Sequence, residues 1–142
     1  MQLSAHDIEI WAKTVYGEAR GESGAARQLM AWTIRNRAVQ RYRGDSIAAC
    51  AQWHAQYSCW NAADPNYRLV CDVSLDDPIF RYCMLSALLV VDAEQKSDPT
   101  HGARHYHTTD KPSWAKTWPP IWAVDHTPCA TIGRHQFYND VA

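Results

Sequence analysis

The sequence lacks a charge excess of either sign and lacks a long apolar run. Its 14 Lys and Arg residues against 15 Asp and Glu residues leave a formal net charge of −1. A chain this close to neutrality has no bulk attraction for nucleic acid or for an anionic membrane. The most apolar run, Ala87 to Val91, is far too short to span a bilayer. We therefore expect no nucleic-acid partner and no stable membrane insertion.

The N-terminal stretch lacks the basic and apolar segments of a secretory signal peptide. We therefore expect a protein made in the cytoplasm without a signal peptide. Nucleotide-binding glycine motifs are also missing, which leaves a nucleotide-binding fold without support. C-x-x-C motifs are absent as well, so we expect the thiols to be reduced. The alternative is one or two disulfides formed in an oxidising space. The cysteines are Cys50, Cys59, Cys71, Cys83 and Cys129.

Aromatic residues with a polar atom are abundant, whereas phenylalanine is scarce. Seven Trp and seven Tyr stand against two Phe. Such rings suit cores, but they also suit grooves, where they stack on the apolar faces of sugars. With 142 residues, 46% of them hydrophobic and 20% charged, the chain is expected to form one globular domain over residues 1–142.

Apolar periodicity predicts a mostly helical chain. Ser4 is a good N-cap for a helix to about Ala19, which Gly21 would terminate. Further helices are expected over 24–42, from Asp45 or Ser46 through 52, and from the Asp77-Pro78 pair to about 95. The last of these is expected to be the buried helix, and residues 53–75 are expected to be irregular.

The C-terminal part has a different pattern. Residues 103–109 alternate as a short strand, and residues 130–138 indicate two short strands about Gly133 and Arg134. Trp118-Pro119-Pro120 excludes regular structure in the segment between them. The expected fold class is therefore α+β, mostly helical, with a small C-terminal β element.

Glu18 and Glu22 are the first candidates for chemistry. At a spacing of four residues they resemble a pair of glycosidase carboxylates, but such a pair must flank the scissile bond from opposite sides. These two would project from one helix edge, so a single acid fits better. Glu18 is the better candidate, because partial burial and the negative end of the helix dipole should both raise its pKa. An exposed glutamate at a helix end remains the alternative.

Histidines and a cysteine suggest two other kinds of site. A zinc site could use ligands from among His101, His105, His107, His126, His135 and Cys129, although no H-E-x-x-H motif is present. Ser58-Cys59 near the histidines could form a nucleophilic site, but nothing in the sequence indicates that Cys59 is activated.

Five motifs, in order, give the chain a resemblance to a known family. V-Y-G-E-A-R-G-E at 15–22 resembles the signature of the SleB-like cell-wall hydrolases, the spore-cortex-lytic enzyme family. R-N-R at 35–37, Y-S-C-W at 57–60, H-G-A-R-H-Y-H-T-T-D-K-P-S-W-A at 101–115 and I-G-R-H-Q-F-Y at 132–138 resemble its later segments. The resemblance extends over nearly the whole chain.

The resemblance implies a peptidoglycan glycosidase with a lysozyme-like helical core, often a lytic transglycosylase, that needs no metal or cofactor. It assigns the acid and base to Glu18, which would protonate the bond between N-acetylmuramic acid and N-acetylglucosamine. Substrate-binding roles are expected for Glu22, Trp60, His105, Tyr106 and Trp114. Glu22 is expected to hold Arg20 or a backbone amide, and Gly17 and Gly21 to leave room for a sugar strand.

A small wall hydrolase made without a signal peptide resembles a phage or prophage endolysin. We therefore expect a monomer that reaches the periplasm and cell wall through holin pores and binds glycan strands there. Three alternatives stay open at this point: muramidase-type hydrolysis of the same bond, a zinc amidase or peptidase that cuts the stem peptide, and a non-catalytic glycan-binding module.

Overall fold

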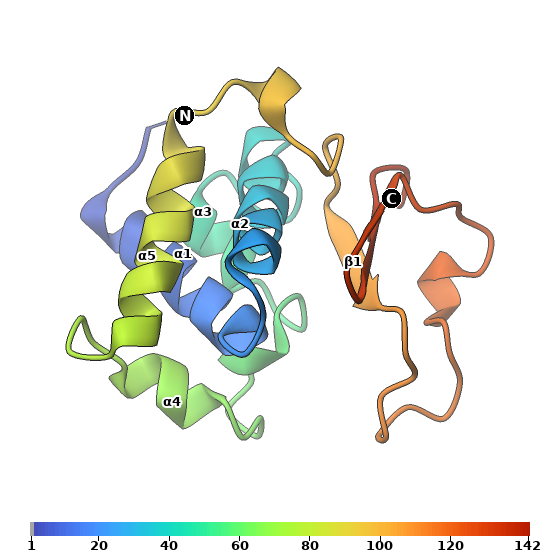
Figure 1. Ribbon diagram of the computed structural model, residues 1–142, viewed down its shortest axis with the longest axis horizontal. Helices are drawn as coiled ribbons and strands as arrows, with labels where there is room; N and C mark the ends of the chain where they lie inside the picture. Colours follow the sequence, from blue (N-terminus) through green and yellow to red (C-terminus); the bar gives the residue numbers. More distant parts are fainter. Residues whose placement is uncertain (1) are drawn as a thin grey trace.

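The computed structural model describes residues 2–142 and has a helical body with a small sheet beside it (Figure 1). The helices are α1 (Ala5–Ala19), α2 (Gly24–Val39), α3 (Ile47–Ala51), α4 (Tyr67–Asp72) and α5 (Pro78–Val91), with short 3-10 turns η1 (Ser58–Trp60), η2 (Gln95–Ser97) and η3 (Ile121–Ala123). The strands are β1 (His105–Thr108), β2 (Ala130–Ile132) and β3 (His135–Tyr138). The predicted class, α+β and mostly helical, is confirmed.

Helix α1 lies at the centre of the helical body and packs against the other four helices. Its N-terminus has the capping box that the sequence predicts, with Asp7 and Ser4 exchanging hydrogen bonds. Trp11 is completely buried and its indole donates to the carbonyl of Ala31, which connects α1 to α2. The helix ends at Ala19 as expected. Gly21, however, does not have the left-handed backbone of a glycine stop.

Two expectations for the helical body are wrong. Residues 53–75 are not all irregular, since α4 forms there and its Val70 is completely buried. Helix α5 is also not the buried helix. Phe80, Cys83, Ser86, Ala87 and Val90 face the body, because α1 and α2 pack against one side only, whereas Leu85 and Leu89 are 50% and 56% exposed.

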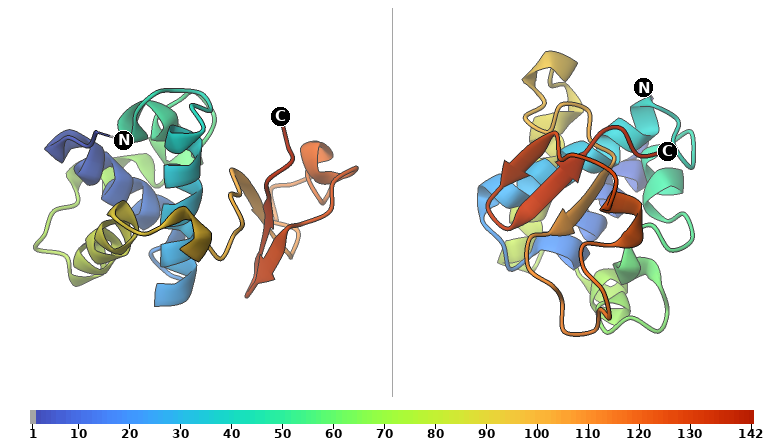
Figure 2. Two further views of the ribbon diagram at one scale, coloured as in Figure 1. Left: turned by 90° about the horizontal axis from the view of Figure 1, so that it is seen from above. Right: turned by 90° about the vertical axis from the view of Figure 1, so that its right-hand side faces the viewer.

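The sheet is antiparallel with the strand order β1-β3-β2. Strands β2 and β3 form the predicted hairpin, and Gly133 turns the chain with a φ of 57°. Tyr106 of β1 pairs with Phe137 of β3, and both side chains join Leu29 of α2 in a small apolar cluster. The sheet thus covers one side of the helical body (Figure 2).

A buried carboxylate holds the segment that leads into β1. Asp98 is 4% exposed and accepts hydrogen bonds from the side chain of Asn36 at 2.7 Å, from the backbone of Gly102 at 2.8 Å and from the backbone of Thr100 at 2.8 Å. Because Asn36 belongs to α2, this network connects the sheet to the helical body.

Across residues 2–142, the helices are all too short or too polar to cross a membrane.

Candidate active site

Glu18 lies in the last turn of α1, where three segments of the chain meet. Its side chain is half-buried. The backbone N–H of Cys59 in η1 donates to Oε1 at 3.3 Å, and the hydroxyl of Tyr106 in β1 donates to Oε2 at 3.2 Å. The carboxyl group is therefore held by helix, turn and strand together.

Burial raises the pKa of Glu18 above its ordinary value. The charge of Asp64 acts in the same direction, whereas the hydrogen bonds from Cys59 and Tyr106 stabilise the carboxylate and lower the pKa. The net direction is upward, as the sequence predicts. A carboxyl group with a raised pKa is suited to donate a proton near neutral pH.

Gly17 explains how η1 comes so close to α1. A Cβ atom at this position would lie 2.5 Å from Cβ and 2.7 Å from Sγ of Cys59, and 2.8 Å from the side chain of Val70. Only glycine permits this approach, which places the Cys59 amide on Glu18. The expectation that Gly17 leaves room for a sugar is therefore wrong: it leaves room for the chain itself. A Cβ atom at Gly21 would meet open space.

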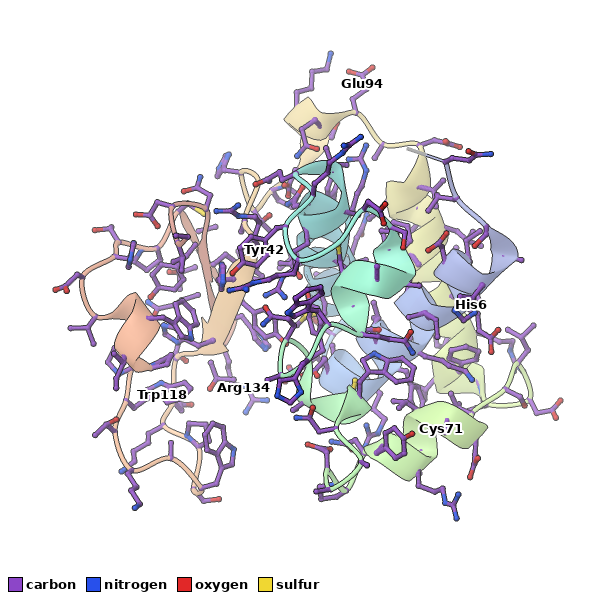
Figure 3. All side chains as sticks on the ribbon, turned by 180° about the vertical axis from the view of Figure 1, so that it is seen from behind. His6, Tyr42, Cys71, Glu94, Trp118 and Arg134 are labelled. Atoms are coloured by element: carbon purple, nitrogen blue, oxygen red, sulfur yellow. The ribbon has the colours of Figure 1, made fainter. Side chains whose placement is uncertain are left out.

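Glu18 opens into a groove of about 760 Å³ between the helical body and the sheet. Tyr42 contributes to it from the helical side and Trp118 from the sheet side (Figure 3). Among residues 2–142, Glu18 is the sole side-chain carboxyl that lines it. The polar and aromatic lining includes Arg37, Tyr42, Arg43, Gln56, Ser58, His105, Tyr106, His107, Thr108, Trp114, Trp118 and Trp122.

Tryptophans line the sheet side of the groove. Trp114 is 79% exposed and meets Trp118 edge-on, with ring centres 6.2 Å apart. The indole of Trp118 donates to the carbonyl of Thr108 at 3.0 Å, which holds the ring against β1. Trp122 packs on His105 and His107. Indole rings at such a surface, with Trp114 exposed and Trp118 and Trp122 half-buried, can stack on sugar rings.

Of the predicted site residues, the structure brings Glu18, Tyr106, His105 and Trp114 together in the lining of this groove. Trp60 and Glu22 lie outside the groove. The indole of Trp60 donates to Thr14 at 2.9 Å and packs against the core.

Glu22 forms an ion pair with Arg134 at 2.9 Å. Arg20, which Glu22 was expected to hold, instead donates to Asn66 at 2.6 Å.

Several groove residues are not among the predicted site residues. Arg37 is 3% exposed, and its place in the apolar stripe of α2 and in the R-N-R motif could have identified it. Tyr42 and Arg43 follow α2 in a turn, and Trp118 and Trp122 lie in irregular segments or a short turn. No periodicity indicates which way such side chains point.

The histidines and Cys59 have other partners. His107 contacts the Tyr138 hydroxyl at 2.8 Å and the Thr108 carbonyl at 2.7 Å, and His126 pairs with Asp140 at 3.0 Å. Throughout the described chain, no three His, Cys, Asp or Glu side chains gather as metal ligands would. Burial raises the pKa of the Cys59 thiol, the opposite of what an activated nucleophile requires.

Comparison with known proteins gives one finding about the family. The family described as Cell Wall Hydrolase matches residues 21–138, a match that begins just after Glu18. Neither the curated proteins nor the solved structures give a match, so the lysozyme-like character of the helical core stays a prediction. Because the match extends over most of the sequence, this chain belongs to the SleB-like family of cell wall hydrolases, which act on peptidoglycan.

Proposed function

We propose that this cell wall hydrolase is a lytic transglycosylase in which Glu18 alone acts as acid and base. The observation that carries the proposal is the single half-buried carboxyl of the groove, its pKa raised by burial. A water-activating hydrolase of the inverting kind needs a second carboxylate across the bond. Within the described residues, the lining of this groove offers none.

The reaction needs one proton donor that later accepts a proton. Glu18 donates its proton to the oxygen between N-acetylmuramic acid and N-acetylglucosamine, and the C–O bond breaks with oxocarbenium character at C1 of the muramic acid. The carboxylate then takes the proton of the C6 hydroxyl, whose oxygen bonds to C1 and closes a 1,6-anhydro ring. No water is consumed, and Glu18 returns to its protonated state.

The two donors on Glu18 fit this cycle. The Cys59 amide and the Tyr106 hydroxyl stabilise the carboxylate that exists between the two proton transfers. Burial favours the neutral acid at the start of the cycle. His105 and the tryptophans Trp114, Trp118 and Trp122 would position the sugars along the groove.

The test is product analysis of purified sacculi with a matched pair of variants. We expect wild-type protein to release muropeptides with anhydro-muramyl ends, identified by mass spectrometry. Glu18→Gln should lose activity by about 10²-fold or more, the usual contribution of a general acid. Glu22→Gln, with its carboxyl in an ion pair outside the groove, is the control and should lose activity only partially.

Other outcomes would contradict the proposal. A tenth of wild-type activity in Glu18→Gln would remove Glu18 from the mechanism. Reducing ends on intact sugars would indicate muramidase-type hydrolysis, and free stem peptides with loss of activity in a chelator would indicate a zinc amidase. Absence of any soluble product would indicate a non-catalytic glycan-binding module. A role in phage-mediated host lysis stays a prediction.

A further inference from the structure

Arginine side chains gather at one end of the groove. We call this region the basic end, and it consists of Arg37, Tyr42, Arg43, Arg104 and His105. The guanidinium carbons of Arg104, Arg43 and Arg37 lie 4.7, 5.3 and 5.5 Å from the centre of the Tyr42 ring. All but Arg104 line the groove. Three arginines around one ring would repel each other unless an anion joined them.

Arg37 and Arg104 donate hydrogen bonds to neutral groups, whereas the Tyr42 hydroxyl donates at 3.3 Å to an oxygen of the C-terminal residue Ala142, which also lines the groove. Arg37, although buried, donates to the Arg104 carbonyl at 2.7 Å and to the Gln56 side-chain oxygen at 2.9 Å. Arg104 donates to the Val141 carbonyl, and its Nε is buried without a partner. Across residues 2–142, none of the three arginines takes part in an ion pair. Buried arginines are ordinarily paired.

The pKa of His105 is affected by the same positive charge. Burial and then the charges of Arg37, Arg104 and Arg43 lower its pKa to about 4. Its Nε2 contacts the Tyr42 hydroxyl at 3.1 Å, and its Nδ1 is buried without a partner. The basic end therefore combines positive charge with two buried nitrogens, Arg104 Nε and His105 Nδ1, that have no hydrogen-bond partner.

The turn after α2 holds Arg43 at some conformational cost. Arg41 and Arg43 both have left-handed backbones, with φ values of 53° and 66°. Residues other than glycine adopt this conformation rarely, and strained positions of this kind cluster at functional sites. Both arginines are exposed, but only Arg43 lines the groove.

Aromatic rings connect the basic end to the acid. The guanidinium of Arg37 lies 4.7 Å from the Tyr57 ring, and this ring stacks on Tyr106 with centres 6.4 Å apart. The hydroxyl of Tyr106 contacts Glu18. Glu18 and the basic end therefore border the same groove, so a strand bound at Glu18 could extend to the basic end.

We propose that the basic end binds a carboxylate of the stem peptide carried by muramic acid, so that peptide-bearing strands are preferred over bare glycan. This inference rests on the proposed function. The sugar rings are neutral, and the lactyl arm of muramic acid is amide-linked wherever a peptide is attached, so the peptide supplies the carboxylates. Arginine suits this role because its planar group binds a carboxylate through two parallel hydrogen bonds.

The experiment compares kcat/KM on two soluble substrates, peptide-bearing strands and the same strands stripped by an amidase. We expect wild-type protein to favour the peptide-bearing strands and Arg43→Gln to lower that preference about tenfold, the effect of one charge-assisted hydrogen bond. Arg41→Gln, a matched arginine of the same turn, should keep the wild-type preference. Arg43→Lys should keep most of it, because the charge remains.

A third substrate, with its peptide carboxylates amidated, separates charge from shape and should be cleaved like the stripped strands. Equal wild-type kcat/KM on all three substrates would overturn the inference while leaving the transglycosylase intact. Stripped strands expose the lactyl carboxylate. A preference for them would assign the basic end to that carboxylate and would also overturn the inference. Failure to cleave any of the three would remove the proposed function itself.

Discussion

Replacing Tyr106 with phenylalanine tests how the Tyr106 hydroxyl affects the pKa of Glu18. The change deletes the hydroxyl that donates to Glu18 at 3.2 Å and keeps the ring, which packs between Tyr57 and Phe137. Burial raises the pKa of Tyr106 itself well above its ordinary value, so the hydroxyl remains a donor throughout the working pH range.

The direction of the effect follows from which form of Glu18 the hydrogen bond stabilises. The Tyr106 hydroxyl stabilises the carboxylate and lowers the pKa of Glu18, so its loss raises that pKa further. The protonated acid then persists to higher pH, and the basic limb of the pH profile moves upward. The carboxylate between the two proton transfers also loses about 1.5 kcal/mol, the low end for a charge-assisted hydrogen bond, because the contact is long. That corresponds to about a tenfold fall in kcat.

The assay measures kcat and kcat/KM for release of soluble muropeptides, from acid to alkaline pH, for wild-type protein and the variant. Tyr57→Phe is the control, since its hydroxyl lies 3.4 Å from Thr33 and makes no hydrogen bond to Glu18. We expect this control to keep the wild-type limb. A basic limb in Tyr106→Phe that stays in place or moves to lower pH would refute the reasoning.

Two further predictions concern stability. Gly17→Ala should lower the free energy of unfolding by about 1–2 kcal/mol, because the overlap with Cys59 outweighs the helix propensity gained; a urea midpoint at or above that of wild type would contradict the close packing. Asp98→Asn should cost at least about 2 kcal/mol, because an amide cannot accept on both sides from Asn36, Thr100 and Gly102. Thermal unfolding measures this loss, and a variant within 0.5 kcal/mol of wild type, a typical surface effect, would remove Asp98 as an anchor.

Local signals in the sequence predict much of the fold. The capping box at Ser4, the Asp77-Pro78 pair and the turn at Gly133 are formed by residues close together in the chain, and all three are present. The same local reasoning fails for α5. Its composition is the most apolar of the three long helices, but which of its faces are covered depends on where α1 and α2 lie, and composition carries no such information.

The candidate site was predictable only where a motif marked it. Glu18 follows an apolar stripe and lies in a family motif, whereas Arg43 lies in none and becomes a groove residue because the sheet lies opposite it. Trp60, by contrast, lies in a family motif but outside the groove. Its indole N–H donates a hydrogen bond to Thr14. Long-range placement decides such cases.

The position of Tyr106 gives the enzyme a form of assembly control. This residue packs with the core of the helical body and with the cluster under the sheet, and its hydroxyl reaches an acid 88 positions earlier in the chain. A partly folded chain with intact helices and an undocked sheet would have Glu18 without this donor and without the opposite wall of the groove. Such a chain would carry its acid but have no active centre, so cleavage of the wall would begin only with complete, correctly folded molecules.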